Sequence, residues 1–392
     1  MVRAPCSVVI TGCGVVSPLG MSLDAFWDGL ASGRSAVAPI RRFRADDLEP
    51  ATAAEVVLDV ADVDRAGAFA LRAAAGALEA AVLRPNDVVP SRLGVVLGTT
   101  LGGMELFERW DAATAAGVPP HPDLQRVPYF AAAAGLAETV GARGPVATTQ
   151  LACASGTQAV ALAADWIRAG RADVVLAGGT DLLCRFVVSG FNALRATTIA
   201  ARPFDRDRQG LVLGEGAAVL VIEEAGHAAR RGATPRARIL GAGAAADGVH
   251  MTAPDREGGG VVRAVGAALA QAGLPPSAVD FVSAHGTGTV FNDAMEARAL
   301  VRLFGERGVP VNGIKGAIGH TLGAAGAFEA VLCVETLGRG TIPPTAGLRE
   351  VDPACAGLDL VREELRRHDV RVAVSTSSGF AGANAALVLG RA

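Results

Sequence analysis

A chain of 392 residues with 51% hydrophobic residues and a formal net charge of −3 is long enough for one large domain or two moderate ones. The small net charge gives no reason to expect nucleic acid or a membrane surface as a partner, and no apolar run reaches the ~18 residues of a membrane span. The six cysteines lack the paired spacing and the density of a disulfide scaffold, so we expect free thiols in a reducing cytoplasm.

Stretches of strand and helix character alternate along the chain. The predicted strands of the first half lie at residues 8–10, 93–98, 145–151, 172–179 and 211–223, and the helices at 23–30, 65–82, 131–140 and from 154 to about 170. The second half repeats this order, with strands at 238–243, 279–284 and 370–375 and helices at 259–272 and 324–337. Such alternation predicts parallel sheets covered by helices.

A cysteine lies where the strand at 145–151 gives way to an alanine-rich helix. This position directs the first free backbone N–H groups of the helix, and the positive end of its dipole, toward the sulfur of Cys153. Both effects favour a thiolate, which indicates a nucleophile. The alternative interpretation is a buried structural thiol, because a free cysteine packs as a small hydrophobic residue.

Two of the six histidines, His285 and His320, lie in glycine-framed loops after predicted strands. Catalytic groups on parallel sheets collect at such carboxyl ends. One cysteine and two histidines there indicate acyl chemistry on a thioester, in which a thiolate attacks and charge on a carbonyl oxygen is stabilised. A zinc site is the competing interpretation, but no ligand pair has the spacing of a zinc finger, and we expect no metal.

Lysine is nearly absent from this chain. Lys315 is the only lysine among 36 lysine and arginine residues, and it lies five residues before His320. A chain that otherwise uses arginine throughout has kept one primary ammonium group, which indicates a site where a guanidinium does not serve.

Taken in order, these motifs resemble those of an elongating β-ketoacyl-acyl carrier protein synthase of the thiolase superfamily. The similarity extends over essentially the whole chain and includes residues 12–18, the segment around Cys153, and residues 202–210, 214–217, 250–252, 285–289, 315–320 and 379–384. The resemblance implies a five-layered α-β-α-β-α fold made of two similar halves. Residues 1–237 would form the half with the nucleophile and the dimer interface, and residues 238–392 the half with the histidines, the lysine and a Gly-Phe loop.

The resemblance also implies catalytic roles. Cys153 would accept the growing acyl chain as a thioester, and the backbone N–H groups of Cys153 and Phe380 would form the oxyanion hole. His285 and His320 would bind the malonyl thioester and stabilise its enolate. Lys315 would support His320 and the local charge balance, with Glu329 as its buried partner, because a buried lysine and glutamate are tolerable together and costly apart.

Further residues match substrate-binding positions of the family. Thr287 and Thr289 would bind the phosphopantetheine arm, and Leu101, Phe130 and Phe191 would line the acyl tunnel. Ser378 stands where fatty-acid enzymes usually have an aromatic residue, so we expect it to loosen or rehydrate the mouth of the pocket.

The substrates would arrive on the phosphopantetheine of an acyl carrier protein, with no permanently bound cofactor. The acidic helix of such a carrier needs a basic surface on the enzyme, for which the resemblance indicates Arg195, Arg206 and Arg208.

The predicted reaction is a decarboxylative Claisen condensation, and the departures from the fatty-acid pattern favour a type II polyketide or polyene pathway. One alternative is a housekeeping fatty-acid elongating synthase. Another is a non-catalytic, chain-length-factor-like subunit, against which the retained Cys153, His285, His320 and Lys315 argue. Both a homodimer and a heterodimer with a chain-length-factor-like homologue remain open.

Overall fold

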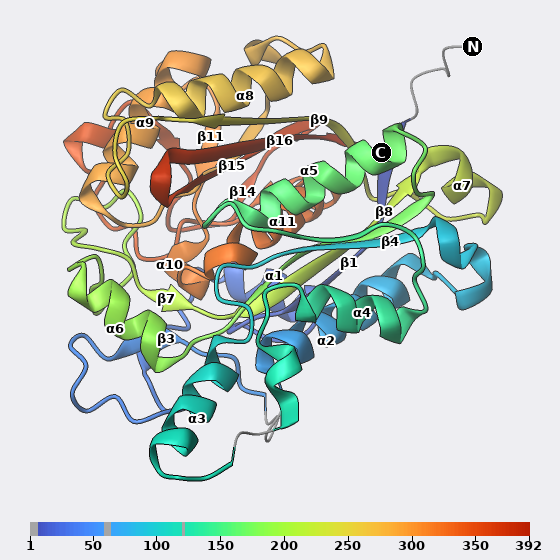
Figure 1. Cartoon of the computed structure of the whole chain (residues 1–392). Helices are drawn as coiled ribbons and strands as arrows, with labels where there is room; N and C mark the ends of the chain where they lie inside the picture. Colours follow the sequence, from blue (N-terminus) through green and yellow to red (C-terminus); the bar gives the residue numbers. More distant parts are fainter. Residues whose placement is uncertain (1–6, 59–63, 120–121) are drawn as a thin grey trace.

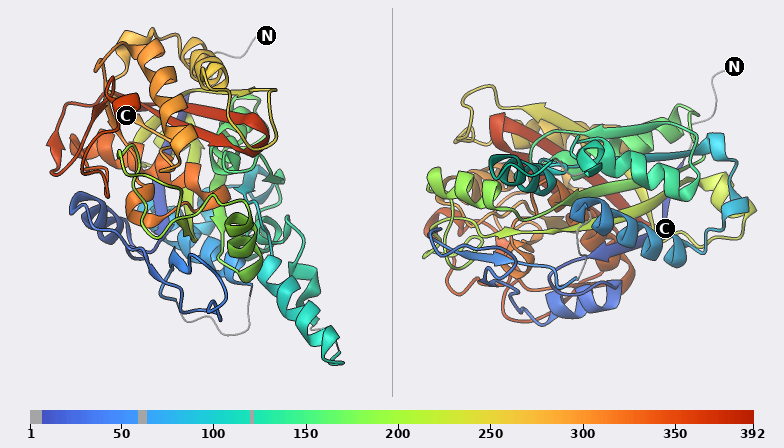
Figure 2. Two further views of the ribbon diagram at one scale, coloured as in Figure 1. Left: turned by 90° about the vertical axis from the view of Figure 1, so that its left-hand side faces the viewer. Right: turned by 60° about the horizontal axis from the view of Figure 1, so that its bottom comes forward.

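The computed structural model describes residues 7–58, 64–119 and 122–392. Its layers alternate between helices and sheet in the order α-β-α-β-α (Figure 1), with α5 (Ser155–Arg168) and α11 (Ala325–Arg339) in the middle layer. Helices α2 (Arg65–Ala81) and α4 (Ala131–Val140) cover one outer face, and α8 (Gly259–Ala272) and α9 (Val290–Phe304) cover the other. Helix α3 (Met104–Ala115) extends away from the body of the molecule (Figure 2).

The remaining elements complete these layers. The other helices are α1 (Leu23–Ala31), α6 (Arg185–Ala193), α7 (Ala225–Arg230) and α10 (Lys315–Ile318). The strands of the main sheet are β1 (Val8–Val16), β4 (Leu93–Gly98), β5 (Val146–Thr149), β6 (Val174–Asp181), β8 (Gly216–Glu224), β9 (Ala237–Ala246), β10 (Phe281–Ser283), β11 (Pro310–Asn312), β13 (Asp359–Leu360), β15 (Val372–Gly379) and β16 (Ala383–Arg391). The short strands at the periphery are β2 (Ala38–Pro39), β3 (Thr52–Ala54), β7 (Leu213–Gly214), β12 (Thr341–Ile342) and β14 (Arg366–Arg367).

The two halves of the main sheet have the same topology. The first half has the order β5-β4-β6-β8-β1 and the second the order β11-β10-β15-β16-β9, with β13 added at its edge. In each half the first three strands are parallel and the fourth is antiparallel to both of its neighbours. The prediction of two similar halves is therefore confirmed. The boundary between residues 237 and 238 stays a prediction; residue 237 begins β9.

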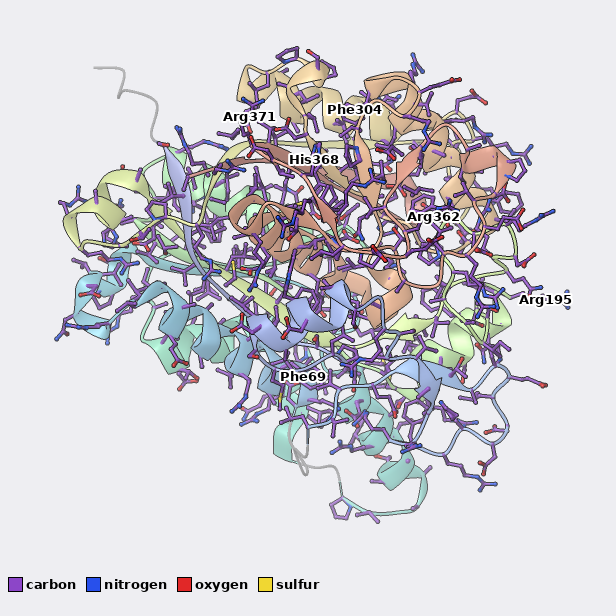
Figure 3. All side chains as sticks on the ribbon, turned by 180° about the vertical axis from the view of Figure 1, so that it is seen from behind. Phe69, Arg195, Phe304, Arg362, His368 and Arg371 are labelled. Atoms are coloured by element: carbon purple, nitrogen blue, oxygen red, sulfur yellow. The ribbon has the colours of Figure 1, made fainter. Side chains whose placement is uncertain are left out.

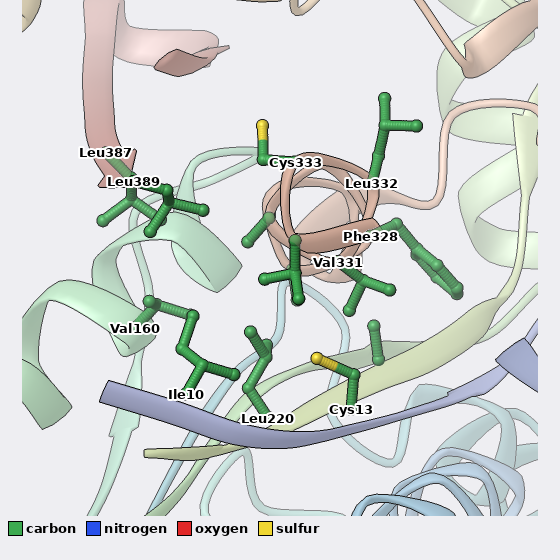
Figure 4. Packing of buried hydrophobic residues seen from close by; sticks show 14 of the residues in the cluster. Ile10, Cys13, Val160, Leu220, Phe328, Val331, Leu332, Cys333, Leu387 and Leu389 are labelled. Carbon is green, nitrogen blue, oxygen red and sulfur yellow. The ribbon is translucent and has the colours of Figure 1, made fainter. Parts of the chain in front are cut away.

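The middle layer holds the deepest core. Every residue of α11 from Ala325 to Leu337 is buried, as expected for a mostly apolar helix that is enclosed by other elements. Phe328 and Val331 of this helix belong to one core cluster with Ile10 and Leu220, which lie on the first half of the sheet facing the helix (Figure 4). None of the described helices is long and apolar enough to cross a bilayer.

Glycine allows α5 and α11 to approach each other closely. A Cβ atom on Gly156 of α5 would lie 2.8 Å from the backbone nitrogen of Ala327 and 2.8 Å from the carbonyl oxygen of Gly323. Both neighbours are backbone atoms, so a side chain at this position would force the helices apart. The start of α5, two residues after Cys153, therefore depends on the absence of a side chain at residue 156.

We expect Gly156→Ala to destabilise the protein by about 1–3 kcal/mol, because overpacking a close helix contact displaces backbone. Gly266→Ala in α8 is the matched control, since nothing lies within 4 Å of its added Cβ. That control is expected to be neutral or to stabilise the helix by up to ~1 kcal/mol. Urea unfolding at one protein concentration measures both variants, and equal effects would contradict the close contact.

Candidate active site

Cys153 lies where two cavities meet. The first, which we call the histidine cavity, has a volume of about 370 Å³ and is lined by His285, Thr287, Thr289, His320 and Ser378, among others. The second, the apolar cavity, has a volume of about 440 Å³ and is lined by residues that include Leu101, Phe186, Val187 and Leu322. The two cavities share four lining residues, which are Cys153, Phe191, Leu194 and Phe380.

A tight turn between β5 and α5 presents the cysteine. Ala152 adopts a left-handed backbone conformation with φ of 46°, which side chains rarely favour. The hydroxyl of Ser155 accepts a hydrogen bond from the backbone N–H of Leu151 at 2.8 Å and donates to the carbonyl of Ala152 at 2.5 Å. These contacts fix the turn, and Cys153 is only 8% exposed within it.

The thiol of Cys153 is strongly affected by this burial. Burial raises its pKa to about 12, and the nearby positive charge of Lys315 acts in the opposite direction. The position at the start of a helix predicts a thiolate, but removal from water dominates because it disfavours the charged form. The resting group is therefore the thiol.

The two histidines present neutral rings to the histidine cavity. Their ring centroids are 5.3 Å apart and the rings are nearly perpendicular, at 84°. Burial, reinforced by the positive charge of Lys315, lowers the pKa of both imidazoles well below the usual 6.5. The backbone N–H of Leu322 donates to Nδ1 of His320 at 3.2 Å, which leaves the ring proton of that histidine on Nε2.

Lys315 is buried, and its ammonium group contacts His285 rather than His320. Its Nζ lies 3.2 Å from Nδ1 of His285 and also donates to the carbonyl oxygen of the same residue. An ammonium group only donates, so Nδ1 of His285 accepts and the ring proton lies on Nε2. Lys315 therefore makes its histidine hydrogen bonds to His285 and not to His320, and its predicted support of His320 stays a prediction. The lysine affects His320 only through its charge, which lowers the pKa of that imidazole.

The third partner of the ammonium group is the carboxylate of Glu329, as predicted. Ser377 of β15 donates to this carboxylate at 3.0 Å, and its hydroxyl lies 2.7 Å from that of Thr157 on α5. Burial raises the pKa of Glu329 to about 7, although Lys315 and Ser377 act in the opposite direction. The ion pair of Lys315 and Glu329 thus connects the loop of His285 to α11 directly and to α5 through Ser377.

Two buried carboxylates that the sequence analysis did not single out hold the loops around the site. Asp181 at the end of β6 accepts from the backbone N–H groups of Leu101 at 3.1 Å and Gly323 at 2.7 Å. Glu296 of α9 accepts from the backbone N–H of His285 at 2.7 Å and of the following glycine at 2.8 Å. Burial raises the pKa of both carboxyl groups. Asp181 could have been recognised from the sequence, because it lies just beyond the carboxyl end of a predicted strand.

The predicted pantetheine-binding threonines lie together in the histidine cavity. The hydroxyl groups of Thr287 and Thr289 are 2.9 Å apart. Thr289 also caps α9 by accepting from the backbone N–H of Asn292 at 3.4 Å. Both hydroxyl groups are therefore positioned by local structure at the wall of the cavity.

The predicted tunnel residues separate into two groups. Leu101 and Phe191 line the apolar cavity, and Phe191 stacks on Phe380 with ring centroids 5.7 Å apart. Phe130 lies outside both cavities of this chain and is 61% exposed, because it begins α4 on the outer face of the sheet. The tunnel position predicted for Phe130 is not met within this chain. Phe186 of α6, which was not predicted, lines the apolar cavity instead.

Ser378 at the mouth of the histidine cavity is hydrogen-bonded within the chain. The hydroxyl of Ser378 is buried and donates to Oδ1 of Asn384 at 2.8 Å. Ser378 thus has a hydrogen-bond partner where the fatty-acid enzymes would have aromatic packing, and the expected loosening or rehydration of the cavity mouth stays a prediction.

The three arginines predicted to dock a carrier have different surroundings. Arg195 is exposed at the edge of the molecule (Figure 3) and borders the histidine cavity. Arg206 is also exposed and is paired with Glu350. Arg208 is only 5% exposed and binds Asp352 at 2.5 Å. The docking role predicted for Arg208 is wrong, because its guanidinium group is used inside the fold.

Metal ligation has no geometric support within residues 7–58, 64–119 and 122–392, where no group of three or more histidine, cysteine, aspartate or glutamate residues is arranged to hold an ion. Two halves of one topology, with a cysteine at the start of one middle helix and two histidines contributed by the other half, define a thiolase-like condensing enzyme.

Comparison with known proteins narrows this class to one family. The models of the β-ketoacyl synthase N-terminal and C-terminal domains match residues 6–228 and 236–349. The chain belongs to the β-ketoacyl synthase family.

Relatives from two kinds of pathway are similar over nearly the whole chain. The putative polyketide beta-ketoacyl synthase 1 of Streptomyces halstedii is 40% identical, with 97% of each chain covered. The 3-oxoacyl-[acyl-carrier-protein] synthase 2 of Coxiella burnetii is 38% identical, with 98% of each covered. Among solved structures, the ishigamide ketosynthase/chain length factor has a TM-score of 0.94 at 37% identity, covering 99% of this chain and 100% of that one.

The pairing of Lys315 with Glu329 predicts a pH-dependent stability defect. In Lys315→Met the buried Glu329 has no cation, and we expect a loss of about 3–5 kcal/mol at pH 8. The folded state then binds a proton that the unfolded state releases above the ordinary glutamate pKa near 4.5. Stability of this variant should therefore rise as the pH falls from 8 toward 5.

The double variant Lys315→Met/Glu329→Gln is the control for this interpretation. It removes both charges, so we expect it to be more stable than Lys315→Met at pH 8 and nearly independent of pH at this site. Denaturant unfolding of the wild type, both single variants and the double variant gives the coupling free energy between Lys315 and Glu329. Additive losses would contradict the ion pair.

Proposed function

We propose that this chain condenses an acyl group held on Cys153 with a malonyl group held on an acyl carrier protein, releasing carbon dioxide and a β-ketoacyl carrier protein. The observation that carries this proposal is the meeting of the Cys153 thiol with two neutral imidazoles, His285 and His320, in one cavity. Family membership supports the same chemistry. The substrates would be supplied on phosphopantetheine.

The first half-reaction is acyl transfer to Cys153. Its sulfur forms a bond to the acyl carbon, the bond to the carrier's sulfur breaks, and the thiol proton passes to the departing pantetheine thiolate. The backbone N–H groups of Cys153 and Phe380 would stabilise the oxyanion. A Cβ on Gly379 would lie 3.0 Å from the nitrogen of Cys153, so the loop before Phe380 comes as close as a glycine allows.

The second half-reaction forms the carbon–carbon bond. The malonyl carboxylate leaves as carbon dioxide, and its bonding electrons move toward the thioester carbonyl to form an enolate. Protons on Nε2 of His285 and His320 would donate hydrogen bonds to that oxygen. The enolate carbon then attacks the thioester on Cys153, the carbon–sulfur bond breaks, and the sulfur takes up one proton from water.

A type II polyketide or polyene pathway is the proposed setting, and the polyketide synthase relative from Streptomyces halstedii supports it. The relative of known structure is a ketosynthase/chain length factor, which supports a heterodimer with a chain-length-factor-like homologue. Fatty-acid elongation is the second candidate, favoured by the relative from Coxiella burnetii. The arrangement of Cys153, His285 and Lys315 argues against a non-catalytic subunit, because such a subunit does not require these residues.

Acylation of Cys153 tests the proposal directly. Incubation with an acyl-carrier thioester should add the mass of one acyl group to the wild type, and Cys153→Ala should remain unmodified. Cys355→Ala is the matched control, because burial raises the pKa of that thiol to about 12 as well. Intact-mass spectrometry measures all three proteins. If the wild-type protein stayed unmodified, the proposed acyl-transfer activity would be ruled out.

Docking of the carrier at Arg195 predicts a selective defect. Charge reversal by Arg195→Glu should raise KM for a carrier-bound acyl group several-fold and leave a small acyl thioester unaffected, because only the carrier is acidic. Arg371→Glu is the control, since Arg371 is exposed on a different part of the surface (Figure 3). Equal losses on both substrates would refute docking at Arg195.

A further inference from the structure

The loop that carries Phe380 is fastened to residues 247–255 by several hydrogen bonds. The backbone N–H of Ala381 donates to the carbonyl of Met251 at 2.6 Å, and that of Asp247 donates to the carbonyl of Gly382 at 2.8 Å. Nδ2 of Asn384 donates to Oδ1 of Asp247 at 2.8 Å. Two segments far apart in the sequence are thereby joined at the mouth of the histidine cavity.

The backbone of this loop is strained. Ala381 has φ of 61°, in the left-handed region that is costly for residues with a Cβ. Such a conformation persists only where surrounding contacts over-determine it. The position of Phe380, one residue earlier, therefore depends on the hydrogen bonds that hold the loop.

Asn384 is the centre of these contacts, and Ser378 completes its hydrogen bonding. The amide is 2% exposed, and its Nδ2 donates to Asp247 and to the carbonyl of Gly382 at 3.0 Å. Its Oδ1 accepts from Ser378 at 2.8 Å. Without that hydroxyl, the buried Oδ1 loses its donor, and the amide cannot turn to seek water without pointing its oxygen at the Asp247 carboxylate.

We propose that Ser378 is a positioning residue for acyl transfer: through Asn384 it holds the loop that places the backbone N–H of Phe380 beside Cys153. The same contacts keep the Phe380 ring stacked on Phe191 at the boundary of the two cavities. This inference rests on the oxyanion hole of the proposed function. Ser378 stands where fatty-acid enzymes usually have an aromatic residue, and that replacement alone would indicate only a loss of packing. The proposal gives the serine hydroxyl a role of its own, which is to hold the loop in place.

The test compares two reactions of Cys153 in Ser378→Ala. Acylation by a small acyl thioester needs the oxyanion hole, whereas alkylation by iodoacetamide needs only access to the sulfur. Complete loss of one oxyanion donor slows such reactions by about 100-fold or more, so a displaced donor should slow acylation by roughly tenfold. Alkylation is expected to stay at or above the wild-type rate.

Two further variants separate loop placement from general stability. Ser375→Ala alters another buried serine of β15 whose Oγ has no hydrogen-bond partner within the described part of the chain, and it should acylate at the wild-type rate. Ser378→Thr keeps the hydroxyl and should recover most of the acylation rate. Thermal unfolding of each variant shows whether the fold is retained.

The proposal is overturned if Ser378→Ala acylates as fast as the wild type, if Ser375→Ala slows equally, or if acylation and alkylation fall together. It is also overturned if Ser378→Thr unfolds like the wild type and acylates no faster than Ser378→Ala. Wild-type acylation at Cys153 in the same assay keeps the proposed function intact in each of these cases. Absence of wild-type acylation would instead remove the proposed function.

Discussion

The buried ion pair of Lys315 and Glu329 is the contact on which the rest of the site depends. Its ammonium group has three partners, two of them atoms of His285, and Glu329 is held in turn by Ser377 of β15. Breaking the pair by removing one member would leave an uncompensated charge in the deepest part of the fold. The same contact determines which nitrogen of His285 carries the proton. The stability of the fold and the position of the ring proton on His285 therefore depend on the same contact.

Around this pair the site is built from fixed dipoles and neutral groups. Burial keeps Cys153 as a thiol and both imidazoles uncharged. The carboxylates of Asp181 and Glu296 accept from backbone N–H groups, so they hold loops in place without a cation. A buried, preorganised set of hydrogen-bond donors stabilises developing charge more strongly than water does, because it needs no reorganisation during the reaction. The proposed chemistry relies on this arrangement more than on a preformed thiolate.

Much of the fold was predictable where the sequence pattern is strong. The strand Leu93–Gly98 and the helices Ala131–Val140 and Gly259–Ala272 have the bounds that their periodicity predicts. Helix α6 and strand β16 were not predicted. Helix α6 is nine residues long, and β16 is rich in alanine, which has low strand propensity. Strand β16 is stabilised by pairing with β15 on one side and β9 on the other, and a local pattern does not contain that information.

The sequence by itself determined the reactive groups. Cys153 and His285 are recognisable because each follows a strand in a small-residue segment, and His320 because it lies in a glycine-framed segment. Lys315 is recognisable because no other lysine exists in the chain. Only the tertiary structure decided which groups meet. It brought Lys315 to His285, buried Arg208, left Phe130 outside both cavities and gave Ser378 a partner in Asn384. The reason is physical: a residue type restricts the chemistry a position can perform, whereas its protonation and partners depend on neighbours that packing brings together from distant parts of the chain.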